Sequence, residues 1–241
     1  MDYYFITGTS KGIGKALAEA ILKEENSYVI GISRNVTIHH PHYHHQHLDL
    51  SDITALRNNL HKVFTFLEKP DKIVLVNNAA VLGEVSYIGS QATDNFEFVF
   101  DVNVIAPAIL MNTFISAYHE QTCPKIILNI SSGAGQRSMD GWSAYCASKA
   151  ALDMLSLTCQ KEQDLLGSGV KVYSLSPGVV DTAMQEHVRE AESSQFSEIE
   201  RFKALKENNE LQEPETVGSK IMKLIKHYQK FNDVILRIDS I

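Results

Sequence analysis

The chain of 241 residues is 44% hydrophobic, carries a formal net charge of −7 and contains three cysteines. This length suits one domain, and the negative charge argues against nucleic-acid or anionic-membrane binding. We expect no membrane-spanning segment, and the first residues are typical of a strand and not of a signal peptide. The sparse cysteines, without metal-ligand spacing, indicate reduced thiols and predict a cytoplasmic protein.

The first segment predicts a strand, a glycine-rich turn and a helix. Tyr3–Thr7 is the expected strand, Gly8–Gly14 the turn and Lys15–Glu25 the helix. Glycines let a backbone approach a pyrophosphate, and the helix N-terminus offers free N–H groups to it. The spacing is GxxxGxG and not the commonest dinucleotide fingerprint, so a turn that binds nothing remains the alternative.

The second expected strand, Tyr28–Ile32, ends in Ser33, Arg34 and Asn35. Proteins that bind NAD often have a carboxylate at this position, for the ribose hydroxyl. Here no carboxylate would repel a 2′-phosphate, and Arg34 can form charge-assisted hydrogen bonds to one. Lys11 in the glycine turn offers a second cation. The sequence therefore favours NADP(H) over NAD(H).

A histidine-rich tract follows, with six histidines among residues 39–47. Such a composition can bind a transition metal. Its proline and its lack of apolar periodicity predict an irregular surface loop instead, with no metal site. Leu48–Leu50 is expected to close a short third strand, and Ser51 and Asp52 to cap a helix that runs to about Leu67.

Four more strands are predicted, at Lys72–Ala80, Lys125–Ile130, Val170–Leu175 and Val234–Ile238. A helix is expected at Phe96–Tyr118, bent by its internal proline, and another from Tyr145 to about Leu166. A charged helical segment from Ala183 to about Asn209, too polar for the core, is expected to form a lid. The pattern indicates a single-domain, Rossmann-type α/β fold: a doubly wound parallel sheet of about seven strands with helices on both faces.

Tyr145 and Lys149 are four residues apart, so on a helix they share one face. A free phenol has a pKa of about 10, and a nearby ammonium favours its ionised form. The pair is a candidate general acid/base. A short YxxxK motif is common, and alone it does not differ from an ordinary helix surface.

The motifs together resemble the short-chain dehydrogenase/reductase family along nearly the full chain. They stand in the family's order and spacing: Thr7–Gly14, Asp49–Leu50, Asn77–Ala80, Asn103, Ser132, Tyr145 with Lys149, and Pro177 to Thr182. Ala80 departs from the family, which usually has glycine there. The resemblance implies a catalytic set of Asn103, Ser132, Tyr145 and Lys149.

The resemblance also implies where ligands bind. The implied substrate contacts are Ser132, Trp142, Tyr145 and Met184. The implied NADP(H) contacts are Gly8, Ser10, Lys11, Gly12, Ile13, Gly14, Ser33, Arg34, Asn35, Asp49, Leu50, Asn77, Asn78, Ala79, Tyr145, Lys149, Pro177, Gly178, Val180 and Thr182. Lys149 is expected to lower the pKa of Tyr145, and Asn103 to position a water that relays protons to Lys149.

Within the family, several stretches are similar to benzil reductases of bacilli and to sepiapterin reductases. Sepiapterin reductases hold the pterin with an aspartate near the C-terminus, where this chain has Leu236, with Asp239 three residues on. This departure favours an aromatic or vicinal diketone over a pterin as the carbonyl substrate. A homodimer or homotetramer is implied. A cofactor sensor without catalysis and a β-ketoacyl carrier-protein reductase are the other readings.

Overall fold

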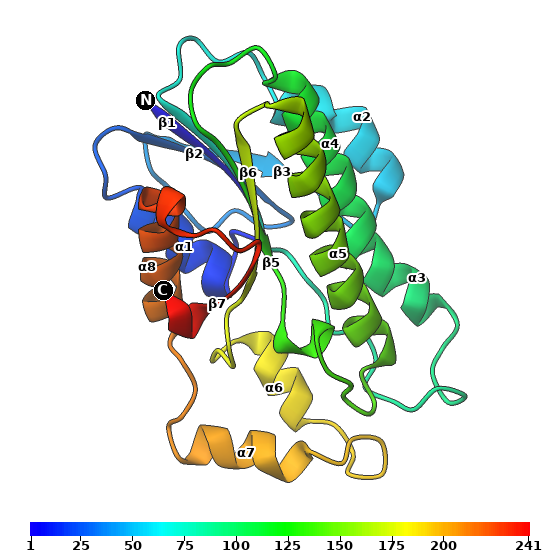
Figure 1. The fold of residues 1–241 in the computed structure, drawn as a ribbon. Coiled ribbons are helices and arrows are strands. Elements are labelled where there is room, and N and C mark those ends of the chain that lie inside the picture. Colours follow the sequence, from blue (N-terminus) through cyan, green and yellow to red (C-terminus); the bar gives the residue numbers. More distant parts are fainter.

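A single parallel β-sheet forms the centre of the molecule, in a computed structural model that describes residues 1–241. Its strand order is β3-β2-β1-β4-β5-β6-β7, and every neighbouring pair is parallel. The strands are β1 Asp2–Thr7, β2 Ser27–Ser33, β3 Tyr43–His47, β4 Lys72–Asn77, β5 Lys125–Ile130, β6 Val170–Ser176 and β7 Ile235–Arg237. The predicted Rossmann-type fold is confirmed, because helices cover both faces of this sheet (Figure 1).

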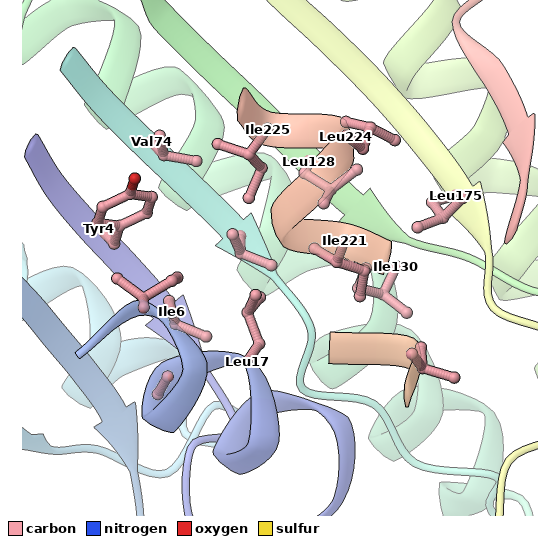
Figure 2. Packing of buried hydrophobic residues seen from close by; sticks show 14 of the residues in the cluster. Tyr4, Ile6, Leu17, Val74, Leu128, Ile130, Leu175, Ile221, Leu224 and Ile225 are labelled. Carbon is pink, nitrogen blue, oxygen red and sulfur yellow. The ribbon is translucent and has the colours of Figure 1, made fainter. Parts of the chain in front are cut away.

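On one face, α1 (Gly12–Ile21) packs beside α8 (Pro214–Lys226) (Figure 1). In Figure 2, Leu17 of α1 lies near Ile6 of β1, and Ile221 of α8 points towards the sheet; both belong to one buried cluster that also includes Val74 of β4. All four side chains have no exposed surface. Burying such a side chain contributes roughly 1.5–3 kcal/mol, so this cluster fixes α1 against the sheet.

The opposite face carries α2 (Ile53–Val63), α4 (Ala106–Ala117) and α5 (Ser143–Leu166) (Figure 1). Phe5 of β1 lies under the rings of Phe64, Phe114 and Tyr118, with centroids 5.1 to 6.4 Å apart. β1 and β4 are apolar on both faces, as parallel strands between two helical layers must be. The central strands are therefore held rigidly, and their carboxyl ends are fixed in relation to one another.

The helix expected at Phe96–Tyr118 consists of three parts: α3 (Asp94–Phe100), a π-helical turn (Asp101–Ile105) and α4. Pro107 has no N–H, so the carbonyl of Asn103 cannot receive the usual bond from four residues on. The chain adopts the wider π turn at this point, where the Ala106 N–H bonds to the Asp101 carbonyl. The expected bend is thus a π turn, and it places Asn103.

The α3–α4 run also corrects the prediction that no segment could span a membrane. Residues 94–117 are long and apolar enough to do so by length and composition. In this fold the run packs against α5 and β4, and Leu110 and Phe114 are fully buried. The protein core therefore accounts for part of its apolar composition, since 44% of the apolar window is buried.

The histidine tract is an irregular loop, as predicted, only in its first part, residues 39–42. Tyr43–His47 forms β3, the edge strand, and it pairs with Val29–Ser33 of β2. Leu48–Leu50, which were expected to close this strand, follow it instead. The prediction was wrong because histidine gives no apolar alternation, while the pairing that makes the strand is non-local.

Other boundaries moved by a few residues. α1 begins at Gly12 and not at Lys15, β4 ends at Asn77 and not at Ala80, and α2 ends at Val63. The expected lid helix is two helices, α6 (Ala183–Arg189) and α7 (Ile199–Glu207). Short 3-10 turns occupy Gly133–Gly135, Tyr228–Lys230 and Ile238–Ser240.

Candidate active site

A cavity of about 540 Å³ lies at the carboxyl ends of the strands. The residues that follow β1, β2, β3, β4, β5 and β6 all line it. The chain runs outward from β1 to β2 and β3, and then crosses back to β4 on the other side of β1. Ligands of open α/β sheets bind at such a switch point, where the direction of the strand order reverses. The cavity lies where the topology predicts a ligand.

The glycine turn forms one end of this cavity. Gly8 and Gly12 have φ angles of +75° and +59°, which side-chain-bearing residues rarely adopt. A Cβ on Gly14 would lie 2.3 Å from Asn78 Nδ2 and 2.5 Å from the Gly8 carbonyl oxygen. α1 begins here without a side-chain cap, so its first N–H groups are free for an anion. The turn fits a pyrophosphate.

Arg34 and Lys11 line the same end of the cavity. The guanidinium of Arg34 lies 3.8 Å from the Asp49 carboxylate, and both side chains are substantially exposed. Asp49 also accepts hydrogen bonds from the N–H and hydroxyl of Ser51. An exposed ion pair at this distance contributes about 0–1 kcal/mol, so it restrains Arg34 only weakly.

Tyr145 and Lys149 lie on the first turns of α5 and line the other end of the cavity. Both are buried, and the Lys149 ammonium lies 5.6 Å from the centroid of the Tyr145 ring. It donates a hydrogen bond of 2.9 Å to the carbonyl oxygen of Ile130, at the end of β5. The structure confirms the prediction that these two side chains lie close together.

Burial changes the acidity of both groups. It raises the pKa of Tyr145 to about 12, while a hydrogen bond to Ser132 acts in the opposite direction. Burial also lowers the pKa of Lys149 to about 8, against the attraction of the Asp153 carboxylate. The expected lowering of the Tyr145 pKa by Lys149 stays a prediction, because burial of the phenol is the largest cause here and the net pKa is raised. Tyr145 is held as a protonated phenol.

Asn103 lies beside this pair, on the π turn. Its amide accepts from the Val81 N–H at 2.9 Å, and it donates to the Val81 carbonyl and the Ser148 hydroxyl. Both amide hydrogens are therefore used by protein groups. The side chain joins the loop after β4 to α5.

Several predicted residues do not line the cavity. Ser132 caps the turn at Gly133 by accepting from the Ala134 N–H. Trp142, predicted to touch substrate, packs edge-on to Tyr145 and stacks on Phe196, with centroids 5.7 and 5.2 Å apart. The others off the cavity wall are Gly14, Asn35, Asn77, Asn103, Gly178 and Val180.

The remaining predicted contacts all line the cavity. They are Gly8, Ser10, Lys11, Gly12, Ile13, Ser33, Arg34, Asp49, Leu50, Asn78, Ala79, Tyr145, Lys149, Pro177, Thr182 and Met184. Lining residues missed from the sequence include Phe98 and Val102, which are one helical turn apart, and Asp181, Glu186 and Lys206. The spacing of Phe98 and Val102 places them on one helix face, and this could have been recognised in the sequence. Lys206 lines the cavity because the fold brings α7 to it, which the sequence pattern does not predict.

Residues of the α6–α7 segment line part of the cavity, among them Met184, Glu186 and Lys206. Lys206 on α7 forms an ion pair of 2.5 Å with Asp181, and Gln212 forms a β-bridge with Val180. Phe196 and Phe202 are buried against Trp142, so the prediction that this segment is too polar for a core was wrong. The segment is charged overall in sequence, but it has one apolar face that packs against Trp142.

Residues 3–193 match the family model described as short chain dehydrogenase. The chain belongs to the short-chain dehydrogenase/reductase family. It is therefore an oxidoreductase that acts on CH–OH or C=O groups with a nicotinamide cofactor. No three His, Cys, Asp or Glu side chains of this dehydrogenase lie close enough together to hold a metal ion.

Individual relatives of this short-chain dehydrogenase support the assignment. A benzil reductase ((S)-benzoin forming) of Bacillus cereus is 34% identical, and the match covers 100% of both chains. A sepiapterin reductase of Meriones unguiculatus is 29% identical over 91% of this chain and 89% of the relative. A crystal structure of a short-chain dehydrogenase/reductase from Saccharomyces cerevisiae, 24% identical, has the same fold, with a TM-score of 0.84 over 99% of this chain and 96% of that one.

The buried lysine predicts how stability depends on pH. The pKa of Lys149 is about 8 in the folded protein and 10.5 in its unperturbed state, so between these values the unfolded chain binds more protons. Stability contributed by this group therefore rises with pH in that window. We expect Lys149→Met to be more stable than the wild type near neutral pH, by about 1 kcal/mol for each unit by which the pKa is lowered.

Urea unfolding of both proteins at about pH 7 and about pH 9 measures this difference. The advantage of the methionine variant should shrink at the higher pH. Lys171→Met on β6 is the matched control, because its ammonium is exposed in the fold. An advantage of Lys149→Met that does not change with pH would contradict the prediction.

Proposed function

We propose that the chain is an NADPH-dependent carbonyl reductase that converts an aromatic or vicinal diketone, such as benzil, to the hydroxyketone. One observation carries this proposal: Tyr145 and Lys149 share a single cavity with the glycine turn and with Arg34. One ligand of dinucleotide size can therefore reach from the cations to the phenol. The full-length similarity to a benzil reductase supports the substrate class.

The cofactor would be held by side chains and backbone groups at the two ends of the cavity. Lys11, Arg34 and Ser10 would hold the 2′-phosphate, the glycine turn the pyrophosphate, and Thr182 with the Val180 backbone the nicotinamide amide. NADPH supplies the hydride that reduces the carbonyl carbon. No carboxylate follows β2 directly, and Asp49, which follows β3, is already paired with Arg34.

The proton for the substrate oxygen would come from Tyr145, which the buried site keeps protonated. Tyr145 and Ser132 would hydrogen-bond the carbonyl and stabilise the developing alkoxide. Lys149 would hold the ribose and favour the phenolate left after proton transfer. The Asn103 carbonyl would hold a water that returns a proton towards Lys149.

The surrounding elements complete the proposal. The α6–α7 segment, residues 183–210, would act as the substrate lid, with Met184 facing the substrate.

Ile105, Met154 and Leu157 are large exposed apolar side chains on the π turn and α5. Pairing of these helices would form a homodimer or homotetramer. The three free cysteines suit a cytoplasmic location.

A pterin carbonyl is the second candidate substrate, because of the similarity to a sepiapterin reductase. The C-terminal residues do not favour it. Leu236 is buried in β7, and Asp239 is exposed and does not line the cavity. No carboxylate of this segment is placed to hold a pterin.

Steady-state oxidation of NADPH with benzil and with sepiapterin, measured side by side, tests the proposed function. We expect turnover of benzil to benzoin at a higher kcat/KM than turnover of sepiapterin. Preference for sepiapterin would move the proposal to the pterin class. Tight NADPH binding without turnover of any carbonyl compound would point to a sensor.

Arg34→Asp is expected to reverse the cofactor preference. It removes charge-assisted hydrogen bonds and places a carboxylate against the 2′-phosphate, so KM for NADPH should rise about 10- to 100-fold. KM for NADH should fall or stay constant. Arg57→Asp makes the same charge change on the exposed face of α2 and serves as the control. Equal use of both cofactors by the wild type would contradict this reading.

A further inference from the structure

Tyr43 is the one residue of the histidine tract that reaches from the edge strand towards the glycine turn. Its ring lies across β2 at Gly31, where a Cβ would be 2.1 Å from the Tyr43 hydroxyl oxygen. Any side chain at position 31 would displace the ring. The Tyr43 ring therefore needs a glycine at position 31 to keep its place. The ring of His45 stacks on that of Tyr43, with the ring centroids 6.4 Å apart.

The hydroxyl of Tyr43 meets the glycine turn. It lies 2.9 Å from the hydroxyl oxygen of Thr9, which has no exposed surface. The Thr9 hydroxyl in turn lies 3.4 Å from that of Ser33, which donates to the carbonyl of Asn35. Three hydroxyl groups thus connect β3, the glycine turn and the end of β2.

Both ends of this chain lie at the proposed cofactor site. Ser33, Arg34 and Ser10 line the cavity, whereas Tyr43 and Thr9 lie behind its wall. A turn with glycines at positions 8, 12 and 14 has few side chains to restrain it, so its conformational freedom is large. A partly buried hydrogen bond to Thr9 restrains the turn and the end of β2 together.

We propose that Tyr43 is a positioning residue for the adenosine end of the cofactor, acting through Thr9 and Ser33. This inference rests on the proposed NADPH-dependent function and deepens it. Tyr43 does not touch the cofactor itself. Its hydroxyl holds Thr9 and Ser33 in the arrangement that presents the 2′-phosphate to Arg34 and Ser10. The histidine tract then serves as an edge strand that carries this tyrosine.

Tyr43→Phe tests the proposal, because it removes the hydroxyl and keeps the ring over Gly31. We expect the Kd of NADPH, measured by fluorescence titration, to rise about 3- to 10-fold, the range of one lost hydrogen bond. The kcat at saturating NADPH should stay within about twofold of the wild type, since Tyr145 and Lys149 are untouched. The Kd of NADH, which has no 2′-phosphate, should rise less.

Tyr173→Phe is the matched control. It also removes a hydroxyl hydrogen bond, at 2.7 Å to the Tyr228 carbonyl, but it lies on β6 outside the cavity. It should leave both Kd values unchanged. A double-mutant cycle with Thr9→Val should show that loss of the Tyr43 hydroxyl has no further effect once Thr9 cannot bond.

The outcomes separate this inference from the function on which it rests. An unchanged NADPH Kd in Tyr43→Phe, equal losses for NADPH and NADH, or additive losses in the cycle would each overturn the role of Tyr43. A wild type that prefers NADH, or binds neither cofactor, would overturn the proposed function as well. None of these titrations depends on knowing the carbonyl substrate.

Discussion

Tyr145→Phe is expected to reduce turnover by about 10²- to 10⁴-fold, the usual contribution of a positioned proton donor. The Kd of NADPH should stay close to that of the wild type. The phenyl ring keeps the edge-on contact with Trp142, so only the hydroxyl that would face the substrate carbonyl is lost. The loss should appear in kcat, because Tyr145 is the proposed proton donor.

Two observations make this result interpretable. Trp142 is the single tryptophan of the chain and touches the Tyr145 ring, so unchanged tryptophan emission shows that the packing is intact. Tyr118→Phe removes a hydroxyl hydrogen bond to the Thr65 carbonyl at the other end of the molecule and should keep full activity. Near-normal turnover by Tyr145→Phe would exclude the phenol as the proton donor.

Gly14→Ala should abolish tight NADPH binding and lower stability. In an ordinary helix, alanine in place of glycine stabilises by roughly 0.8–1 kcal/mol. Here the new Cβ would lie 2.5 Å from the Gly8 carbonyl oxygen and 2.3 Å from the Asn78 amide nitrogen, which is hydrogen-bonded to the Thr7 carbonyl. The turn has to move, and such overpacking costs about 1–3 kcal/mol.

Thermal unfolding and an NADPH titration measure the two effects. We expect a lower Tm and a Kd at least about 10-fold higher, because the pyrophosphate would lose its backbone N–H partners. Gly133→Ala is the control, since its Cβ would meet no atom within 4 Å and its φ is not positive. It should leave Tm unchanged. A Gly14→Ala protein as stable as the wild type, with the same Kd, would exclude the close approach.

The fold could be predicted well because its central strands are buried on both faces. Lys125–Ile130 has the boundaries expected from its apolar run, and all its residues are buried. The glycine turn and the pair of Tyr145 and Lys149 are also local patterns whose positions follow from the strand ends and the helix period. These local signals were sufficient to place both ends of the cavity.

Features that depend on non-local contacts could not be predicted in the same way. Tyr43–His47 of the histidine tract forms a strand only by pairing with β2. The Tyr43 ring can lie across β2 only because residue 31 is a glycine. Trp142 is near the catalytic pair in sequence, but Phe196 covers it from a distant segment. The pKa of Tyr145 likewise depends on burial, which spacing along a helix does not reveal.

Turnover of benzil with NADPH by the purified protein tests the central claim most directly. The wild type should consume one NADPH for each benzoin formed, and Tyr145→Phe should bind NADPH equally well and form almost none. This result would show that one cavity joins the cofactor to the phenol. Binding of NADPH by both proteins, with no benzoin formed by either, would contradict the account.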